Sequence, residues 1–191
     1  SSDKMFSSIN NSIKNLGVKK LNLCFLHQNE LEIISDKNIM KSLKLLKEYN
    51  LVDEIGTSIY NEEELDFTLS NELYDWVQIP TNILDTYFYD KIDKFNSNIK
   101  IAARSIFLQG IIFQDLKTIQ KTMKNSRELI DFIDLIKTKL NVDDEKFKQV
   151  AISFFNYLEK LSMIIIGSSC PPHIDHFFNS LNKTIDKDKL A

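Results

Sequence analysis

Five short apolar runs in this chain each carry a side chain that could bind a polar ligand. His27, Ser58 and Gln78 occupy such positions in the first three runs, and Ser105 and Ser169 end the last two. An imidazole at the end of a strand could donate a hydrogen bond to a carbonyl oxygen, and it could equally be a satisfied core histidine. The runs, in order, are LNLCFLH, VDEIGTS, DWVQIPTN, IKIAARS and SMIIIGSS.

Helix-length amphipathic segments separate these runs, which predicts parallel strands that are buried on both faces. An α/β protein builds its site from polar groups at the carboxyl ends of such strands. Successive strand-end residues lie 31, 20 and 27 positions apart, and the last interval, of 63 positions, must hold an extra helix or a lid. No linker, repeat or low-complexity segment divides the chain. We therefore expect one helix, five βα units and a single domain over residues 1–191.

Residues with known capping preferences mark the helix boundaries. Asp36 and Asp143 are placed to begin helices, and Asn61 with Glu64 predicts a capping box. Gly17 is expected as the left-handed cap of the first helix. Four phenylalanines at helical spacing suggest a cofactor-contacting cluster, but this spacing is more typical of core positions. They are Phe154, Phe155, Phe177 and Phe178.

The composition limits the classes of function. The 191 residues suffice for one sizeable core, and a net charge of −3 gives no reason to expect a nucleic-acid partner. No apolar run approaches the roughly 18 residues of a membrane span. Two cysteines exclude a disulfide framework and suggest a reduced, cytoplasmic protein. His173 and His176 have the spacing of a metal-binding pair, but with no evident third ligand we expect no metal site.

Five stretches of the chain, taken in order, resemble the aldo/keto reductase family over nearly the whole length. The family fold is a (β/α)8 barrel (a TIM barrel), and the resemblance implies its fourth to eighth strands, an incomplete barrel without its N-terminal units. The start of the sequence, which has no initiating Met, suggests that the true amino terminus lies upstream. The matching stretches are NLGVKKLNLCFLH, LLKEYNLVDEIGTSIYN, WVQIPTNILD, IKIAARSIFLQGIIF and MIIIGSS.

The resemblance implies an NAD(P)H-dependent oxidoreductase that reduces an aldehyde or ketone. His27 matches the family's histidine that orients the substrate carbonyl. The family's tyrosine general acid, with its lysine and aspartate, belongs to the first three βα units, so we expect these 191 residues alone to be inactive. The implied partner is a small-molecule carbonyl substrate, and the oligomeric state stays open.

The resemblance also assigns residues that would bind the nicotinamide end of the cofactor, which is NADP or NAD. Ser58 and Gln78 match the residues that hold the carboxamide, although Ile59 stands where the family often has asparagine. Arg104 stands where an aromatic side chain commonly stacks on the nicotinamide. Its guanidinium could also stack, or it could form a structural salt bridge. Asn82 is expected to be a turn residue.

The remaining cofactor residues match the phosphate-binding loops. Ser105, Gln109 and Gly110 would line the pyrophosphate loop. The turn after the last strand would cradle the phosphate near the adenosine with helix N-terminal amides. This turn offers only His173 in place of the family's usual lysine or arginine, so the resemblance gives no NADP preference. Its three residues are Gly167, Ser168 and Ser169.

Two other functions remain open at this level. The departures at Ile59 and Arg104, and the uncharged phosphate loop, motivate a non-catalytic cofactor-binding or regulatory barrel (a pseudoenzyme). A phosphate-binding barrel unrelated to this family is the third reading. Five of eight strands would also leave two open parallel edges, so we expect the isolated chain to aggregate or to need a missing portion.

Overall fold

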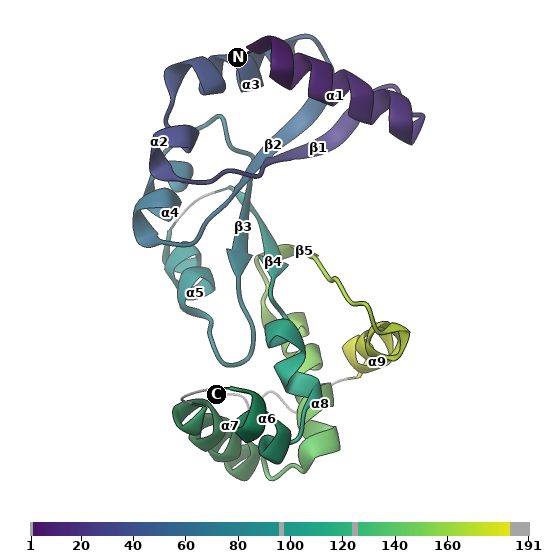
Figure 1. Ribbon diagram of the computed structural model, residues 1–191. Coiled ribbons are helices and arrows are strands. Elements are labelled where there is room, and N and C mark those ends of the chain that lie inside the picture. Colours follow the sequence, from purple (N-terminus) through teal and green to yellow (C-terminus); the bar gives the residue numbers. More distant parts are fainter. Residues whose placement is uncertain (1, 96–97, 124–125, 184–191) are drawn as a thin grey trace. The chain divides into compact units, whose positions relative to one another are not determined.

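The computed structural model describes residues 2–95, 98–123 and 126–183 of the chain (Figure 1). Its five strands form one sheet in the order β1-β2-β3-β4-β5, and the registers between the first three are parallel. The alternation of strands and helices confirms the predicted α/β class. The strands are β1 (Leu21–Leu26), β2 (Val52–Ser58), β3 (Trp76–Pro80), β4 (Lys100–Arg104) and β5 (Leu161–Ile164).

Nine α-helices and two 3-10 helices lie in the described part of the chain, and none of them is long and apolar enough to cross a membrane. The short helices α2, α6 and η1 were not predicted from the sequence. The α-helices are α1 (Ser2–Leu16), α2 (Leu31–Ile34), α3 (Lys37–Glu48), α4 (Glu62–Leu69), α5 (Tyr87–Lys94), α6 (Leu116–Thr122), α7 (Arg127–Leu140), α8 (Asp144–Ser153) and α9 (Pro171–Leu181). The 3-10 helices are η1 (Leu108–Phe113) and η2 (Phe154–Tyr157).

The chain divides into two compact units. The first unit comprises Ser1–Ile79 and Ile92–Ala102, and the second comprises Pro80–Lys91 and Ala103–Ala191. The single domain expected over residues 1–191 stays a prediction.

In the first unit, α1 and α3 lie side by side along β1 and β2 (Figure 1). The core between them holds buried aliphatic residues of α3 and β2 and the ring of Tyr74. Asp36 begins α3 as predicted, because its carboxylate accepts from the N–H groups of Asn38 and Ile39, both at 2.9 Å. Gly17 has φ +66°, as expected for a left-handed helix cap.

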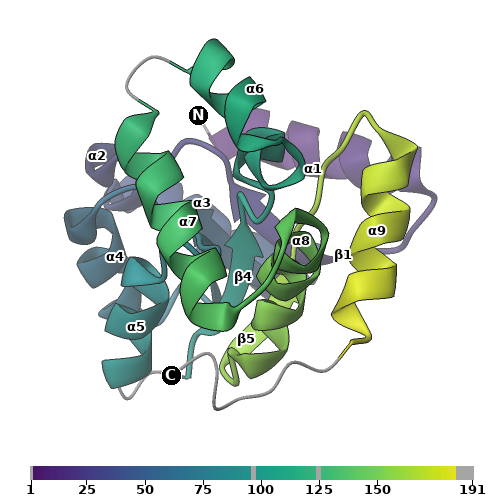
Figure 2. The same cartoon turned by 90° about the horizontal axis from the view of Figure 1, so that it is seen from below.

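In the second unit, α8 lies beside α9 and α6 beside α7 (Figure 2). Ile119, Ile133 and Phe147 form the buried centre between α6, α7 and α8. Asp143 caps α8 as predicted, with its carboxylate 2.7 Å from the N–H of Lys146. Asn141, in the left-handed region at φ +51°, ends α7.

Three sequence-based expectations about this architecture were wrong. β5 ends at Ile164 and does not continue to Ser169. β1 and β5 are only partly buried, because each is an edge strand with a neighbour on one side. Phe178 is 56% exposed and not part of the core, whereas Phe155 and Phe177 are buried there as predicted.

Candidate functional site

Three strand ends lie next to one another in the first unit. Leu26 pairs with Thr57, so His27 follows β1 beside the end of β2, and Ser58 pairs with Gln78 across β2 and β3. The Ser58 hydroxyl donates to the Gln78 side-chain oxygen at 3.0 Å. Ser58 and Gln78, which the resemblance assigned to one end of the cofactor, are therefore in direct contact, and their role there stays a prediction.

This pair has the chemistry to bind a carboxamide. The Ser58 oxygen keeps lone pairs that can accept from an amide N–H, and the Gln78 amide nitrogen can donate to a carbonyl oxygen. Ile59 is fully buried, and its N–H donates to the Gln78 backbone carbonyl at 3.0 Å. Its side chain therefore belongs to the core and does not stand in for the amide that the family often places there.

His27 lies one residue beyond β1 and is exposed. It lines a hollow of about 630 Å³, whose walls also come from α1, β1 and α3. Cys24 lies in the same wall, and burial raises the pKa of its thiol. The reactive thiolate is thereby disfavoured, so Cys24 is a poor candidate for a nucleophile in this hollow.

The second unit contains a hollow of about 390 Å³, which we call the loop hollow. Its walls are residues 105–110, which follow β4, and residues 165–170, which follow β5, together with His173. Two segments far apart in sequence thus face one cavity at the ends of two strands. Six predicted cofactor residues line it: Ser105, Gln109, Gly110, Gly167, Ser168 and Ser169.

The backbone of the first wall is unusual. Ser105, Leu108, Gln109 and Gly110 all have positive φ, at +60°, +49°, +57° and +89°. Glycine adopts this conformation without strain, whereas for the other three it costs free energy. Turns of this kind point successive N–H groups to one side and can form an anion-binding concavity. Arg104 adjoins this loop, with its Nη1 3.3 Å from the Ser105 hydroxyl.

The start of α9 offers fewer free backbone N–H groups for a phosphate than the sequence suggested. Pro171 and Pro172 have no N–H, and the N–H of His173 donates to the Cys170 carbonyl at 3.0 Å. The Ser168 hydroxyl accepts from the Cys170 N–H, also at 3.0 Å. Phosphate contacts here would therefore come from the Gly167–Ser169 turn and its hydroxyls more than from the helix end.

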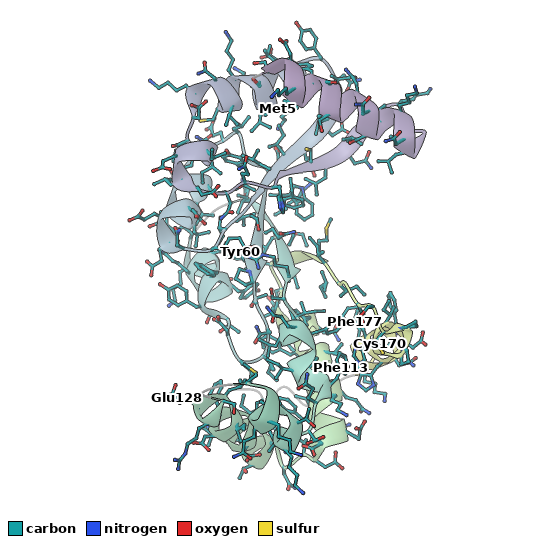
Figure 3. All side chains as sticks on the ribbon, viewed as in Figure 1. Met5, Tyr60, Phe113, Glu128, Cys170 and Phe177 are labelled. Carbon is teal, nitrogen blue, oxygen red and sulfur yellow. The ribbon has the colours of Figure 1, made fainter. Side chains whose placement is uncertain are left out.

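An aromatic cluster, which the sequence did not predict, joins the two walls. The Phe113 ring stacks on His173 with centroids 4.0 Å apart and planes at 10°. Phe107 meets both Phe113 and Phe177 edge-to-face, at 5.1 and 5.9 Å. Phe113, Phe177 and Cys170 are seen together where η1 faces α9 (Figure 3). No periodicity links residue 113 to residue 173, so only the folded structure shows this contact.

The aldo/keto reductase family model matches residues 1–191. The chain belongs to the aldo/keto reductase family. Among solved structures, the holo form of an aldo-keto reductase from Bacillus halodurans has a TM-score of 0.77 and 13% identity. That match covers 100% of this chain and 65% of the other. The glycerol dehydrogenase from Gluconobacter oxydans has a TM-score of 0.68 and 14% identity, covering 98% and 62%.

The comparison with curated proteins found no match. The chain spans less than two thirds of the length of the two solved structures it resembles. Their fold likeness agrees with the predicted incomplete (β/α)8 barrel of parallel strands alternating with helices. Members of the aldo/keto reductase family are oxidoreductases.

Gly167 lies on one wall of the loop hollow, whose lining residues the resemblance assigned to the phosphates of the cofactor. A Cβ added at Gly167 would meet no protein atom within 4 Å, so this wall leaves space for a ligand. The hydroxyls of Ser105, Ser168 and Ser169 lie around the same space, whereas the N–H groups of Leu108 and Gly110 donate within their own loop, at 3.0 and 2.8 Å. The residues that line the hollow include no lysine or arginine, so they offer no fixed positive charge to a 2′-phosphate.

Within the described parts of the chain, no group of three or more His, Cys, Asp or Glu side chains could hold a metal ion. His173 instead stacks on Phe113, and His176 meets the same ring edge-on at 5.7 Å. Asn82 is a turn residue as expected, since its side-chain oxygen accepts from the Leu84 N–H at 2.9 Å.

Proposed function

We propose that this chain is the cofactor-binding part of an NAD(P)H-dependent reductase of aldehydes or ketones. The observation that carries the proposal is the loop hollow, where six of the nine expected cofactor residues meet. Ser58 and Gln78 support it from the first unit, because their hydrogen-bonded pair is complementary to a carboxamide.

In the proposed reaction, the bound nicotinamide supplies the hydride. The hydroxyl of Ser58 and the amide of Gln78 fix which face of the ring is presented. The loop after β4 and the turn after β5 hold the pyrophosphate. His27 donates a hydrogen bond to the substrate carbonyl oxygen, which orients the carbonyl and stabilises the negative charge that develops on it.

Binding of NADH or NADPH by variants of the hollow tests this proposal. Gly167→Val adds a branched side chain where the structure leaves open space, so we expect it to lower the affinity at least roughly tenfold by steric exclusion. Ser162→Val, at an exposed position of β5, is the control for an added branched side chain. If the wild type and Gly167→Val bound the nucleotide with equal affinity, the nucleotide would not occupy the loop hollow.

A non-catalytic cofactor-binding barrel is the second candidate. Buried Ile59 favours it, because this residue cannot complete the amide clamp. The two candidates differ in turnover by the full-length protein. Nucleotide binding without oxidation of NADH or NADPH across a panel of aldehydes and ketones would favour the non-catalytic reading.

A further inference from the structure

A buried carboxylate joins two loops of the first unit that carry proposed site residues. Glu64 lies in the first turn of α4 and is only 4% exposed. Its Oε2 accepts from the backbone N–H of Tyr60 at 2.7 Å and from the Asn29 side-chain amide at 3.0 Å. Asn29 lies two residues after His27, and Tyr60 lies two residues after Ser58. One oxygen therefore connects the loop after β1 to the turn after β2.

The other carboxylate oxygen completes a helix cap. Glu64 Oε1 accepts from the Asn61 side-chain amide at 2.8 Å, and the Glu64 N–H donates to Asn61 Oδ1 at 2.9 Å. The capping box predicted from the sequence is thus present. A helix cap accounts for the contacts with Asn61, but it does not account for the contact with Asn29, which comes from a different βα unit.

We propose that Glu64 is a positioning residue of the nicotinamide end, acting through Asn29 and Tyr60 to hold the loops of His27 and Ser58. This inference rests on the proposed function. Both oxygens of the Glu64 carboxylate accept from N–H groups, and a buried network whose polar groups are paired rigidifies its surroundings. Tyr60, labelled in Figure 3, leads from β2 into α4, so its N–H fixes the turn directly after Ser58.

Asn29→Ala is the most direct test, because it removes the link to the β1 loop and leaves the α4 cap in place. Glu64→Gln is the conservative variant, since it keeps one acceptor oxygen. Asp143→Ala is the matched control: it removes a capping carboxylate from α8 that accepts only a local N–H. Thermal unfolding of each variant verifies that the fold is kept.

The readout is affinity for NADH compared with ADP-ribose, which lacks the nicotinamide ring. We expect Glu64→Ala to weaken NADH binding roughly tenfold while ADP-ribose binding is unchanged, since the turn after Ser58 loses the carboxylate that accepts from the Tyr60 N–H. Glu64→Gln should restore part of the affinity lost in Glu64→Ala. Equal losses for both ligands, or no loss for either, would overturn the positioning role.

A second readout does not depend on nucleotide binding. NMR spectra of the wild type and of Asn29→Ala report the His27 imidazole and the Ser58 amide. We expect the chemical shifts of both groups to change in Asn29→Ala and to be unchanged in Asp143→Ala. If the wild type binds neither ligand, the proposed function fails, and the NMR comparison still decides whether Glu64 holds the two loops. Unmoved signals in Asn29→Ala would refute that role.

Discussion

The Ser58 hydroxyl donates to the Gln78 side-chain oxygen at 3.0 Å, across two parallel strands that place both residues in register. The contact fixes the orientation of both groups. It leaves the serine oxygen able to accept and the glutamine nitrogen able to donate, and a carboxamide needs both of these partners.

Because Ser58 and Gln78 act as one unit, their removal should not be additive. We expect Ser58→Ala and Gln78→Ala each to weaken NADH binding by about 0.5–1.5 kcal/mol, and the double variant to lose little more than either single variant. Calorimetric titration of the four proteins measures this cycle. Fully additive losses would mean that the two residues bind independently.

Gly56 lies where β2 passes close to its neighbours, so a side chain there should destabilise the first unit. A Cβ would contact the Phe25 ring and approach the Trp76 Cβ to 2.9 Å. Gly56→Ala should therefore lower the free energy of unfolding by about 1–3 kcal/mol. Gly167→Ala is the control, since its Cβ would meet no neighbour. Urea unfolding measures both, and a neutral Gly56→Ala would contradict the described packing of β1, β2 and β3.

Tyr74 should make the fold sensitive to alkaline pH. Its hydroxyl donates to the buried Ile34 carbonyl at 2.7 Å, and burial raises its pKa to about 12 from the ordinary 10. The folded state keeps the proton that the unfolded state releases, so stability is present below pH 10 and falls as the pH rises from 10 towards 12.

Tyr74→Phe isolates this contribution. The variant should lose about 1–3 kcal/mol at neutral pH, because the Ile34 carbonyl loses its partner. Its stability should then fall less than that of the wild type between pH 10 and 12. If the stabilities of the two proteins fell equally between pH 10 and pH 12, a buried Tyr74 phenol would not be the cause.

His176 should make the second unit sensitive to acid. Burial lowers the pKa of His176 below its ordinary 6.5, while Glu145 opposes the shift and Lys148, Lys183 and His173 add to it. The unfolded state therefore takes up a proton at a pH where the folded state does not. Stability is lost as the pH falls through 6.5 towards the lower, folded pKa.

His176→Phe removes this titration and keeps a ring against Phe113. We expect the variant to lose less stability than the wild type between pH 7 and pH 5. Chemical unfolding at several pH values measures the difference, and His27→Gln is the control for an exposed imidazole. If His176→Phe lost as much stability as the wild type between pH 7 and pH 5, the acid sensitivity would arise from another group.

The sequence predicted where the strands lie along the chain and most helix starts, because these depend on local patterns. The apolar runs, the caps at Asp36, Asn61 and Asp143, and the left-handed Gly17 need only neighbouring residues. The polar strand ends also follow from local pattern, but the cofactor roles of Ser58, Gln78 and the lining of the loop hollow were implied by the resemblance to the aldo/keto reductase family.

Contacts between distant residues were not predictable in this way. The Asn29–Glu64 hydrogen bond joins residues 35 positions apart, and the Phe113–His173 stack joins two separate helices. Two open sheet edges were expected for five of eight strands, but the apolar run of β5 gave no sign that its own side chains would be partly exposed. Pro171 and Pro172 begin α9 without N–H groups, so this helix end has fewer free amides than the resemblance implied.

Calorimetric titration of the full-length protein with NADH and with NADPH tests the central claim most directly. We predict that at least one of them binds with micromolar affinity. Gly167→Val should bind the same nucleotide roughly tenfold more weakly. The preferred nucleotide then shows whether the uncharged lining of the loop hollow accepts a 2′-phosphate. Absence of binding by both nucleotides would contradict the proposed reductase function.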